Sequence, residues 1–80
     1  MNTATQPMEV VIHVDETLDE SERSGLADRL ASNDGIYGAE FCSNRYHLML
    51  VQYNREELTS QQVLHHINSQ AVHAELVGPV

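Results

Sequence analysis

Carboxylate side chains gather in one short segment between an apolar run and a helix-like pattern. The segment carries Asp15, Glu16, Asp19, Glu20 and Glu22. Carboxylate oxygens are hard ligands that suit divalent cations, and their negative charge also attracts a basic protein. A plainer explanation is helix electrostatics, because acidic residues stabilise a helix N-terminus by about 0.3–1 kcal/mol each. The segment therefore predicts one of three roles: a hard-cation site, a docking surface around residues 19–22, or helix stabilisation.

Histidine is the second residue type with chemical potential, with five copies in 80 residues. His13 and His73 fall on segments that we expect to be neighbouring strands, with both side chains on the same sheet face. Imidazole nitrogens bind Zn(II), Cu(II) and Ni(II), so this pair predicts a two-ligand metal site that a second copy would complete. The alternative is two surface histidines. His47 is expected to face inward or to lie at the end of the sheet, as a hydrogen-bonded structural residue, and Cys42 lies on the far edge strand.

Composition excludes several classes of protein. The net charge of −8 would repel the phosphates of nucleic acid. A single cysteine points to a reducing compartment, and residues 1–7 have no signal-peptide pattern. No apolar run approaches the roughly 20 residues that span a membrane. We therefore expect a cytoplasmic protein without a nucleic-acid or membrane role. It also lacks a glycine-rich phosphate loop and a Ser–His–acid arrangement, which predicts that it is not an enzyme.

The first part of the chain predicts a strand followed by a capped helix. Met8–Val14 is apolar on both faces, as is typical of a central strand. Asp19 is a good N-cap, and Glu22 three residues later completes a capping box. We expect the helix to run to about residue 33 and Gly35 to end it in a left-handed conformation.

The second part predicts a hairpin, another capped helix and a last strand. Residues 43–45 read Ser-Asn-Arg, which suits a short turn between two strands. Thr59 and Gln62 form a second capping box. The predicted segments are a disordered tail at 1–7, strands at 36–42, 46–53 and 72–77, a helix beginning after residue 59, and a fraying end at 78–80.

The order strand, helix, strand, strand, helix, strand predicts an α+β fold of the ferredoxin-like βαββαβ type. Right-handed crossovers place both helices on one face of a four-stranded antiparallel sheet. The strand order would be 4-1-3-2, which puts the two most apolar strands in the centre. Residues 8–77 would form this single domain.

Three stretches resemble the heavy-metal-associated domain of copper chaperones and metal-pumping ATPases. They are Leu26–Leu30 with Asp34-Gly35-Ile36, Leu48–Asn54, and Leu58–Ile67 with Ala71–Glu75. The resemblance spans nearly the whole predicted domain and implies its fold. It also implies where a metal would bind, because the family carries Cys-x-x-Cys in the loop entering the first helix. Two thiolates at that spacing bind Cu(I).

This chain departs from the family at that motif. Counting back from Leu26 and Leu30, Asp19 and Glu22 stand at the positions of the two cysteines, and Thr17 stands at that of a preceding methionine. Carboxylates are hard ligands and do not hold Cu(I). The resemblance therefore implies the fold without the Cu(I) chemistry, and no motif predicts a cofactor.

The sheet face opposite the helices is predicted to be apolar. Its residues are Val11, Tyr46, Leu48 and Leu50, with His13 and Val77 beside them. Such a face on a small domain needs a cover, either a protein partner or a second copy. The leading hypothesis is a non-enzymatic adaptor module that uses this face or the acidic loop. The alternative is a metal-handling protein that binds Zn, Cu or Ni through histidine and carboxylate. A regulatory small-ligand domain is a third class that this fold hosts.

Overall fold

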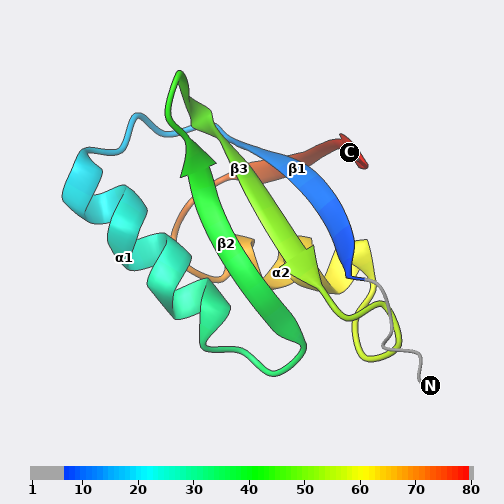
Figure 1. Ribbon diagram of the computed structural model, residues 1–80. Coiled ribbons are helices and arrows are strands. Elements are labelled where there is room, and N and C mark those ends of the chain that lie inside the picture. Colours follow the sequence, from blue (N-terminus) through cyan, green and yellow to red (C-terminus); the bar gives the residue numbers. More distant parts are fainter. Residues whose placement is uncertain (1–6, 80) are drawn as a thin grey trace.

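The computed structural model describes residues 7–79 and confirms the predicted architecture (Figure 1). Most of the predicted tail at 1–7, together with Val80, lies outside the described residues. Of the helices among residues 7–79, none is long and apolar enough to cross a membrane. The elements are β1 (Met8–Val14), α1 (Glu20–Ala31), β2 (Ile36–Cys42), β3 (Arg45–Tyr53), α2 (Ser60–Asn68) and β4 (Ala74–Pro79).

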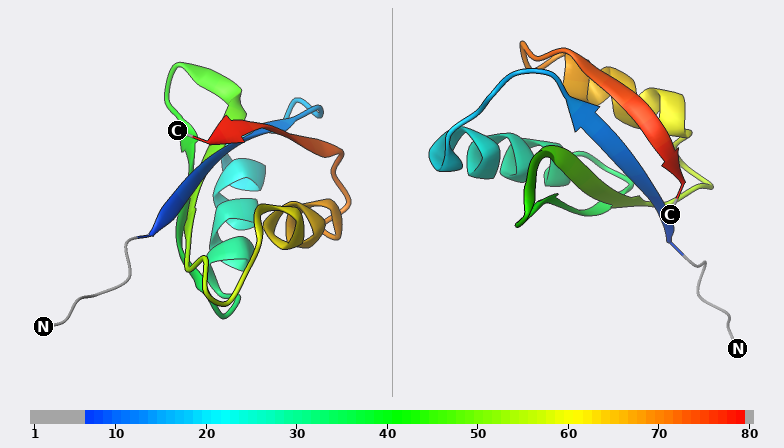
Figure 2. Two further views of the ribbon diagram at one scale, coloured as in Figure 1. Left: turned by 90° about the vertical axis from the view of Figure 1, so that its right-hand side faces the viewer. Right: turned by 90° about the horizontal axis from the view of Figure 1, so that it is seen from above.

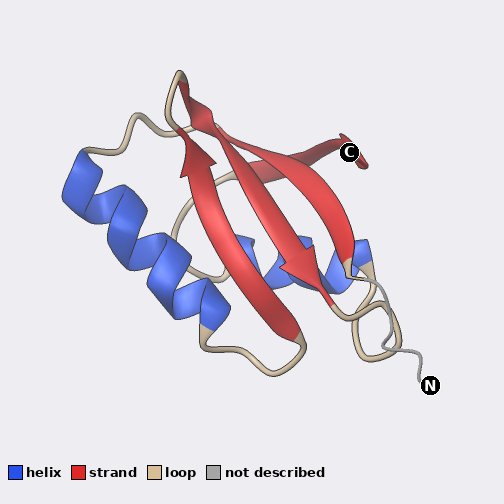
Figure 3. Ribbon diagram, viewed as in Figure 1, coloured by secondary structure: helices blue, strands red, loops and turns tan. Residues whose placement is uncertain are grey.

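The sheet has the order β2-β3-β1-β4, which is the predicted 4-1-3-2, and every neighbouring pair is antiparallel. Both helices cover one face of it, and the other face carries no helix (Figures 2 and 3). The two central strands, β1 and β3, bury three residues each, whereas the edge strand β2 buries one. The alternation of side chains explains this arrangement, because each strand sends every second residue toward the helices.

The core lies between the sheet and the two helices. Strand positions of one parity are buried, and the helix residues that meet them follow a helical spacing. The fully buried side chains include Ile12, Val14, Met49 and Val51 from the sheet, Leu26 and Leu30 from α1, and Val63 and Ile67 from α2.

Both helices begin at the predicted capping boxes. The Asp19 carboxylate accepts a hydrogen bond from the Glu22 N–H at 2.7 Å, and Glu22 Oε1 accepts one from the Asp19 N–H at 3.0 Å. Thr59 and Gln62 form the same reciprocal pair at the start of α2.

The end of α1 differs from the prediction. The helix stops at Ala31, and Ser32 caps it by donating its hydroxyl to the Arg29 carbonyl at 2.7 Å. Gly35 does have a positive φ of 88°, but it lies beyond the cap and turns the chain into β2. A Cβ at Gly35 would come within 3.0 Å of Leu58 Cδ1, so this turn needs glycine for space as well as for conformation.

The last strand begins two residues later than predicted and runs on through Gly78 and Pro79, which were expected to fray. The side chain of Asn68, the last residue of α2, fixes this start. Its Oδ1 accepts from the Ala74 N–H at 2.7 Å, and its Nδ2 donates to the Ala74 carbonyl at 3.3 Å. Ala71 reverses the chain before the strand with a φ of 65°.

Candidate functional site

The start of α1 holds carboxylates at the positions where the resemblance places thiolates. The oxygens of Asp19 and Glu22 accept from backbone N–H groups of the first turn, as described above. The guanidinium of Arg23 donates to the Leu18 carbonyl and closes the loop further. These carboxylate oxygens are hard ligands, and they already accept hydrogen bonds at the helix start. They therefore do not fit Cu(I). The structure supports helix stabilisation as the role of this pair.

A second carboxylate of the same loop ties it to the segment before β4. Glu16 accepts from the backbone N–H of His73 at 2.8 Å and meets its ring Nδ1 at 2.7 Å. The hydrogen bond from the His73 backbone, followed by that from its ring, lowers the pKa of Glu16. The hydrogen bond to Glu16 raises the pKa of His73. His73 itself precedes β4, whereas we predicted it on the strand.

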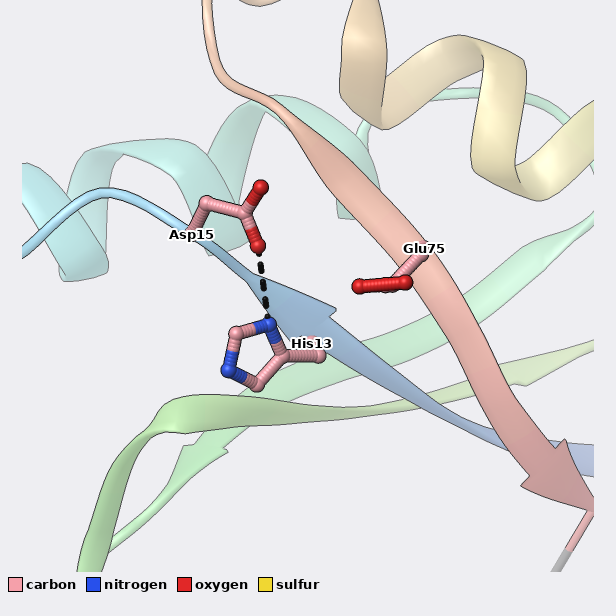
Figure 4. A group of neighbouring side chains, drawn as sticks. All are labelled: His13, Asp15 and Glu75. Carbon is pink, nitrogen blue, oxygen red and sulfur yellow. Dashed lines mark hydrogen bonds and ion pairs between the residues drawn. The ribbon is translucent and has the colours of Figure 1, made fainter.

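We call the bonded pair of Glu16 and His73 the strap. Next to it, His13, Asp15 and Glu75 form a cluster (Figure 4). Each residue offers a ligand atom, and these atoms all lie within 4.8 Å of one another. His13 Nδ1 is 3.0 Å from Asp15 Oδ1. Glu75 comes from β4, where it is the register partner of His13. The cluster thus combines one imidazole with two carboxylates from two paired segments.

His47 supports this cluster from the neighbouring strand. Its ring stacks on that of His13, with 5.5 Å between centroids and 15° between planes. Its Nδ1 lies 2.7 Å from the Val14 carbonyl, which can only accept, so Nδ1 carries the hydrogen. This confirms the expected role of His47 as a hydrogen-bonded structural residue.

The predicted partners of the metal site are only partly brought together. Within residues 7–79, the group with three ligand atoms in reach contains His13 but not His73. The prediction did not assign Asp15 and Glu75 to a site with His13. The position of Asp15, two residues beyond His13, was a usable signal because residues i and i+2 of a strand share a face. The pairing of His13 with His73 stays a prediction.

The helix-free sheet face has the predicted apolar centre. Val11, Leu48 and Leu50 are half-buried, and Val11 pairs with Leu50 across β1 and β3. Val77 is 59% exposed. Tyr46, at 60% exposed, is partly engaged, because the Arg23 guanidinium lies 4.4 Å from its ring centroid.

Acidic residues surround that centre. Glu40 of β2 is the register partner of Leu50, and Glu75 of β4 is that of His13. Glu9 lies beside them on β1 and accepts from Gln52 Nε2 at 2.7 Å. The face therefore presents an apolar centre with carboxylates on three of its four strands.

No protein-family model and no curated protein matches this chain. Solved structures do match. A copper-binding domain from HMA7, a P-type ATPase, is 11% identical with a TM-score of 0.80, over 90% of this chain and 96% of that one. The N-terminal domain of a potential copper-translocating P-type ATPase from Bacillus subtilis is 14% identical with a TM-score of 0.79, over 92% and 91%.

The first domain of the human copper chaperone for SOD1 is also similar. It is 20% identical with a TM-score of 0.77, over 92% of this chain and 97% of that one. At these identities the likeness concerns the fold. The chain therefore has the ferredoxin-like fold of heavy-metal-associated copper-binding domains, as the resemblance implied.

Proposed function

We propose that this domain is a non-enzymatic binding module that recognises a basic protein surface through the helix-free face of its sheet. The observation that supports this is the composition of that face: an apolar centre of Val11, Leu48 and Leu50 with carboxylates around it. Burying the centre against a partner would supply the favourable free energy, and the charged rim would select the partner.

Charge favours a basic partner over a second copy. The chain has twelve acidic and four basic residues, and Glu9, Glu40 and Glu75 belong to this face. Two copies packed face to face would bring these carboxylates together, and such like-charge contacts oppose association. A partner with an apolar centre and a rim of Lys or Arg avoids that cost.

The acidic loop is the weaker half of the predicted interface. Asp19 and Glu22 use oxygens to cap α1, and Glu16 holds His73. Of the acidic residues predicted as contacts, we retain Glu20, in the first turn of α1, at the edge of the docking surface. The sheet face carries the rest of the proposed interface.

A photo-crosslinker at position 48 tests this function in cells. A matched crosslinker replaces Asp28, an exposed residue of α1. We expect position 48, but not position 28, to capture a protein with net positive charge. Purified partner should then lose binding to Leu50→Asp and to Glu40→Lys, while Asp28→Lys binds normally. Salt should weaken binding, because exposed charges are screened over about 8–10 Å. Equal capture at both positions, or capture of a second copy, would contradict the proposal.

A second candidate function is the binding of a divalent metal ion by histidine and carboxylate ligands. The cluster of His13, Asp15 and Glu75 favours it.

A further inference from the structure

We propose that His13, Asp15 and Glu75 form a binding site for one divalent transition-metal ion of the zinc class. The site lies at the end of the sheet where β1 stops and β4 starts (Figure 4). It differs from the position implied by the family resemblance, which is the loop at Asp19 and Glu22. It shares Glu75 with the acidic rim of the partner surface proposed above, but its three ligands all come from this chain, so it does not need a partner.

Backbone pairing holds the three residues in place without a metal. Asp15 directly follows β1, and its carboxylate meets the His13 ring at 3.0 Å (Figure 4). The Asp15 N–H donates to the His73 carbonyl at 2.8 Å, so the pairing of the two segments continues past the end of β1. Glu75 is the register partner of His13 on β4. The ligands therefore sit on a hydrogen-bonded frame.

The distances between donor atoms suit a tetrahedral ion after small side-chain rotations. With Zn–N and Zn–O bonds of about 2.0–2.1 Å, ligand atoms around a tetrahedral ion lie about 3.3 Å apart. His13 Nδ1 and Asp15 Oδ1 are 3.0 Å apart, and the whole set lies within 4.8 Å. Glu75 is exposed, so its side chain can rotate toward the other two.

The donor set selects the class of ion. One imidazole and two carboxylates supply nitrogen and oxygen ligands, which suit Zn(II), Ni(II) and Cu(II) and do not suit Cu(I). Two carboxylates also neutralise the charge of a divalent ion. Three protein ligands leave one position for water or an exchanging group, which is the pattern of an open site.

The surroundings leave the cluster free to bind. Among residues 7–79, each ion pair joins a histidine to a carboxylate, so no arginine neutralises Asp15 or Glu75. The side chains of His13 and Asp15 are 39% and 58% exposed, so an ion can reach them from solvent. His47 stacks on His13 and limits the tilt of its ring. Glu16 and His73 lie nearby but are bonded to each other.

Calorimetric titration of the untagged full chain with Zn(II) alone tests the site. We expect one ion per chain, and His13→Ala, Asp15→Asn and Glu75→Gln should each weaken binding at least about tenfold because one of three ligands is lost. The matched controls are His73→Ala, an exposed histidine nearby, and Glu20→Gln, an acidic residue at the start of α1. Both should bind as the wild type does.

Co(II) provides an independent readout of the same site. The wild type should give the visible absorption of a four-coordinate Co(II) ion, and His13→Ala should lose it. Leu50→Asp should retain both metals, which separates this site from the partner surface. Absence of stoichiometric Zn(II) binding would overturn the proposal. So would binding that His73→Ala removes as completely as His13→Ala, because that result would assign the ion to the two histidines.

Discussion

The loop between β1 and α1 has a carboxylate group at each end, and the two ends differ in what those carboxylates contact. At the α1 end, Asp19 and Glu22 accept hydrogen bonds from backbone N–H groups. At the β1 end, Asp15 contacts the ring of His13, and Glu75 lies across the strand pair. Both ends are acidic, so charge alone does not distinguish them.

The two ends differ in the group that meets the carboxylates, which is a backbone N–H at the α1 end and an imidazole ring at the β1 end. A backbone amide keeps its hydrogen at neutral pH, so a carboxylate that accepts from it is committed to the helix start. An imidazole hydrogen can leave, and its nitrogen then becomes a metal ligand. An acidic residue is available for binding only when its neighbours can release it. We infer that the first end stabilises the helix, and we propose that the second binds a metal ion.

The largest expected effect comes from converting the structural end into a soft-metal site. Asp19→Cys combined with Glu22→Cys should create Cu(I) binding that is absent from the wild type, because two thiolates then stand at the spacing that binds this ion. Competition with a chromophoric Cu(I) chelator measures it. Asp19→Ser with Glu22→Ser is the control and should bind none. A double-cysteine variant that binds no better than this control would show that the two positions are wrongly assigned.

The next effect concerns the support of the β1 end. His47→Phe keeps an aromatic ring beside His13 but removes the donor to the carbonyl of Val14, whose side chain is fully buried. An unsatisfied buried acceptor costs about 1–3 kcal/mol, so the free energy of unfolding should fall by that amount in urea denaturation. His65→Phe, at an exposed position of α2, should change it by less than about 0.5 kcal/mol. Equal effects would mean that the bond from His47 does not support the strand end.

A smaller effect separates the two ends directly. Asp19→Ala should lower the free energy of unfolding by about 0.5–2 kcal/mol, since it removes an N-cap, and should leave Zn(II) binding intact. Asp15→Ala should do the reverse, with little change in stability and loss of Zn(II). Urea denaturation and calorimetry of both variants measure the two quantities. If Asp19→Ala also lost Zn(II), the two ends would not be independent.

The smallest effect is the pH dependence of the strap between them. Because its pKa is lowered, Glu16 contributes to the free energy of unfolding. This contribution is present above the ordinary pKa of 4.5 and is lost as pH falls through the lowered pKa. Because its pKa is raised, His73 contributes to the free energy of unfolding as well. That contribution is present below the ordinary pKa of 6.5 and is lost as pH rises through the raised pKa. The strap should therefore stabilise most between pH 4.5 and 6.5.

An NMR titration of the His73 ring checks this strap. Glu16→Gln should return the pKa of His73 toward 6.5, because the carboxylate that raises it is gone. Glu20→Gln should leave the pKa of His73 as it is in the wild type. A pKa that does not respond to Glu16→Gln would show that the pair does not persist in solution.

The fold could be predicted because its signals are local. Strand alternation, both capping boxes and the central placement of β1 and β3 depend on residues close together in sequence. The end of α1 was missed because the side chains of Ser32 and Asn33, rather than Gly35, donate to the last carbonyls of the helix. Polar side chains that cap a helix C-terminus leave a weaker sequence signal than glycine.

The site was only half predictable because it depends on the register of β4. We placed the strand at 72–77, with His73 on the same face as His13, whereas β4 starts at Ala74 and Glu75 is the register partner of His13. A shift of two residues keeps every side chain on its face, so alternation cannot detect it. The Asn68 side chain accepts from the N–H of Ala74, the first residue of β4, and this bond joins α2 to β4 across the turn between them.

The pairing of β1 with β4 also decides how the molecule can be tethered. Val10 pairs with Pro79, and Val14 pairs with Ala74. The described chain therefore enters and leaves at one end of the sheet, and His13, Asp15 and Glu75 lie toward the other. A bead, a sensor chip or a fused protein attached beyond either of these points would orient that cluster outward. Immobilisation at either terminus should thus leave the opposite tip of the domain accessible to ions in solution.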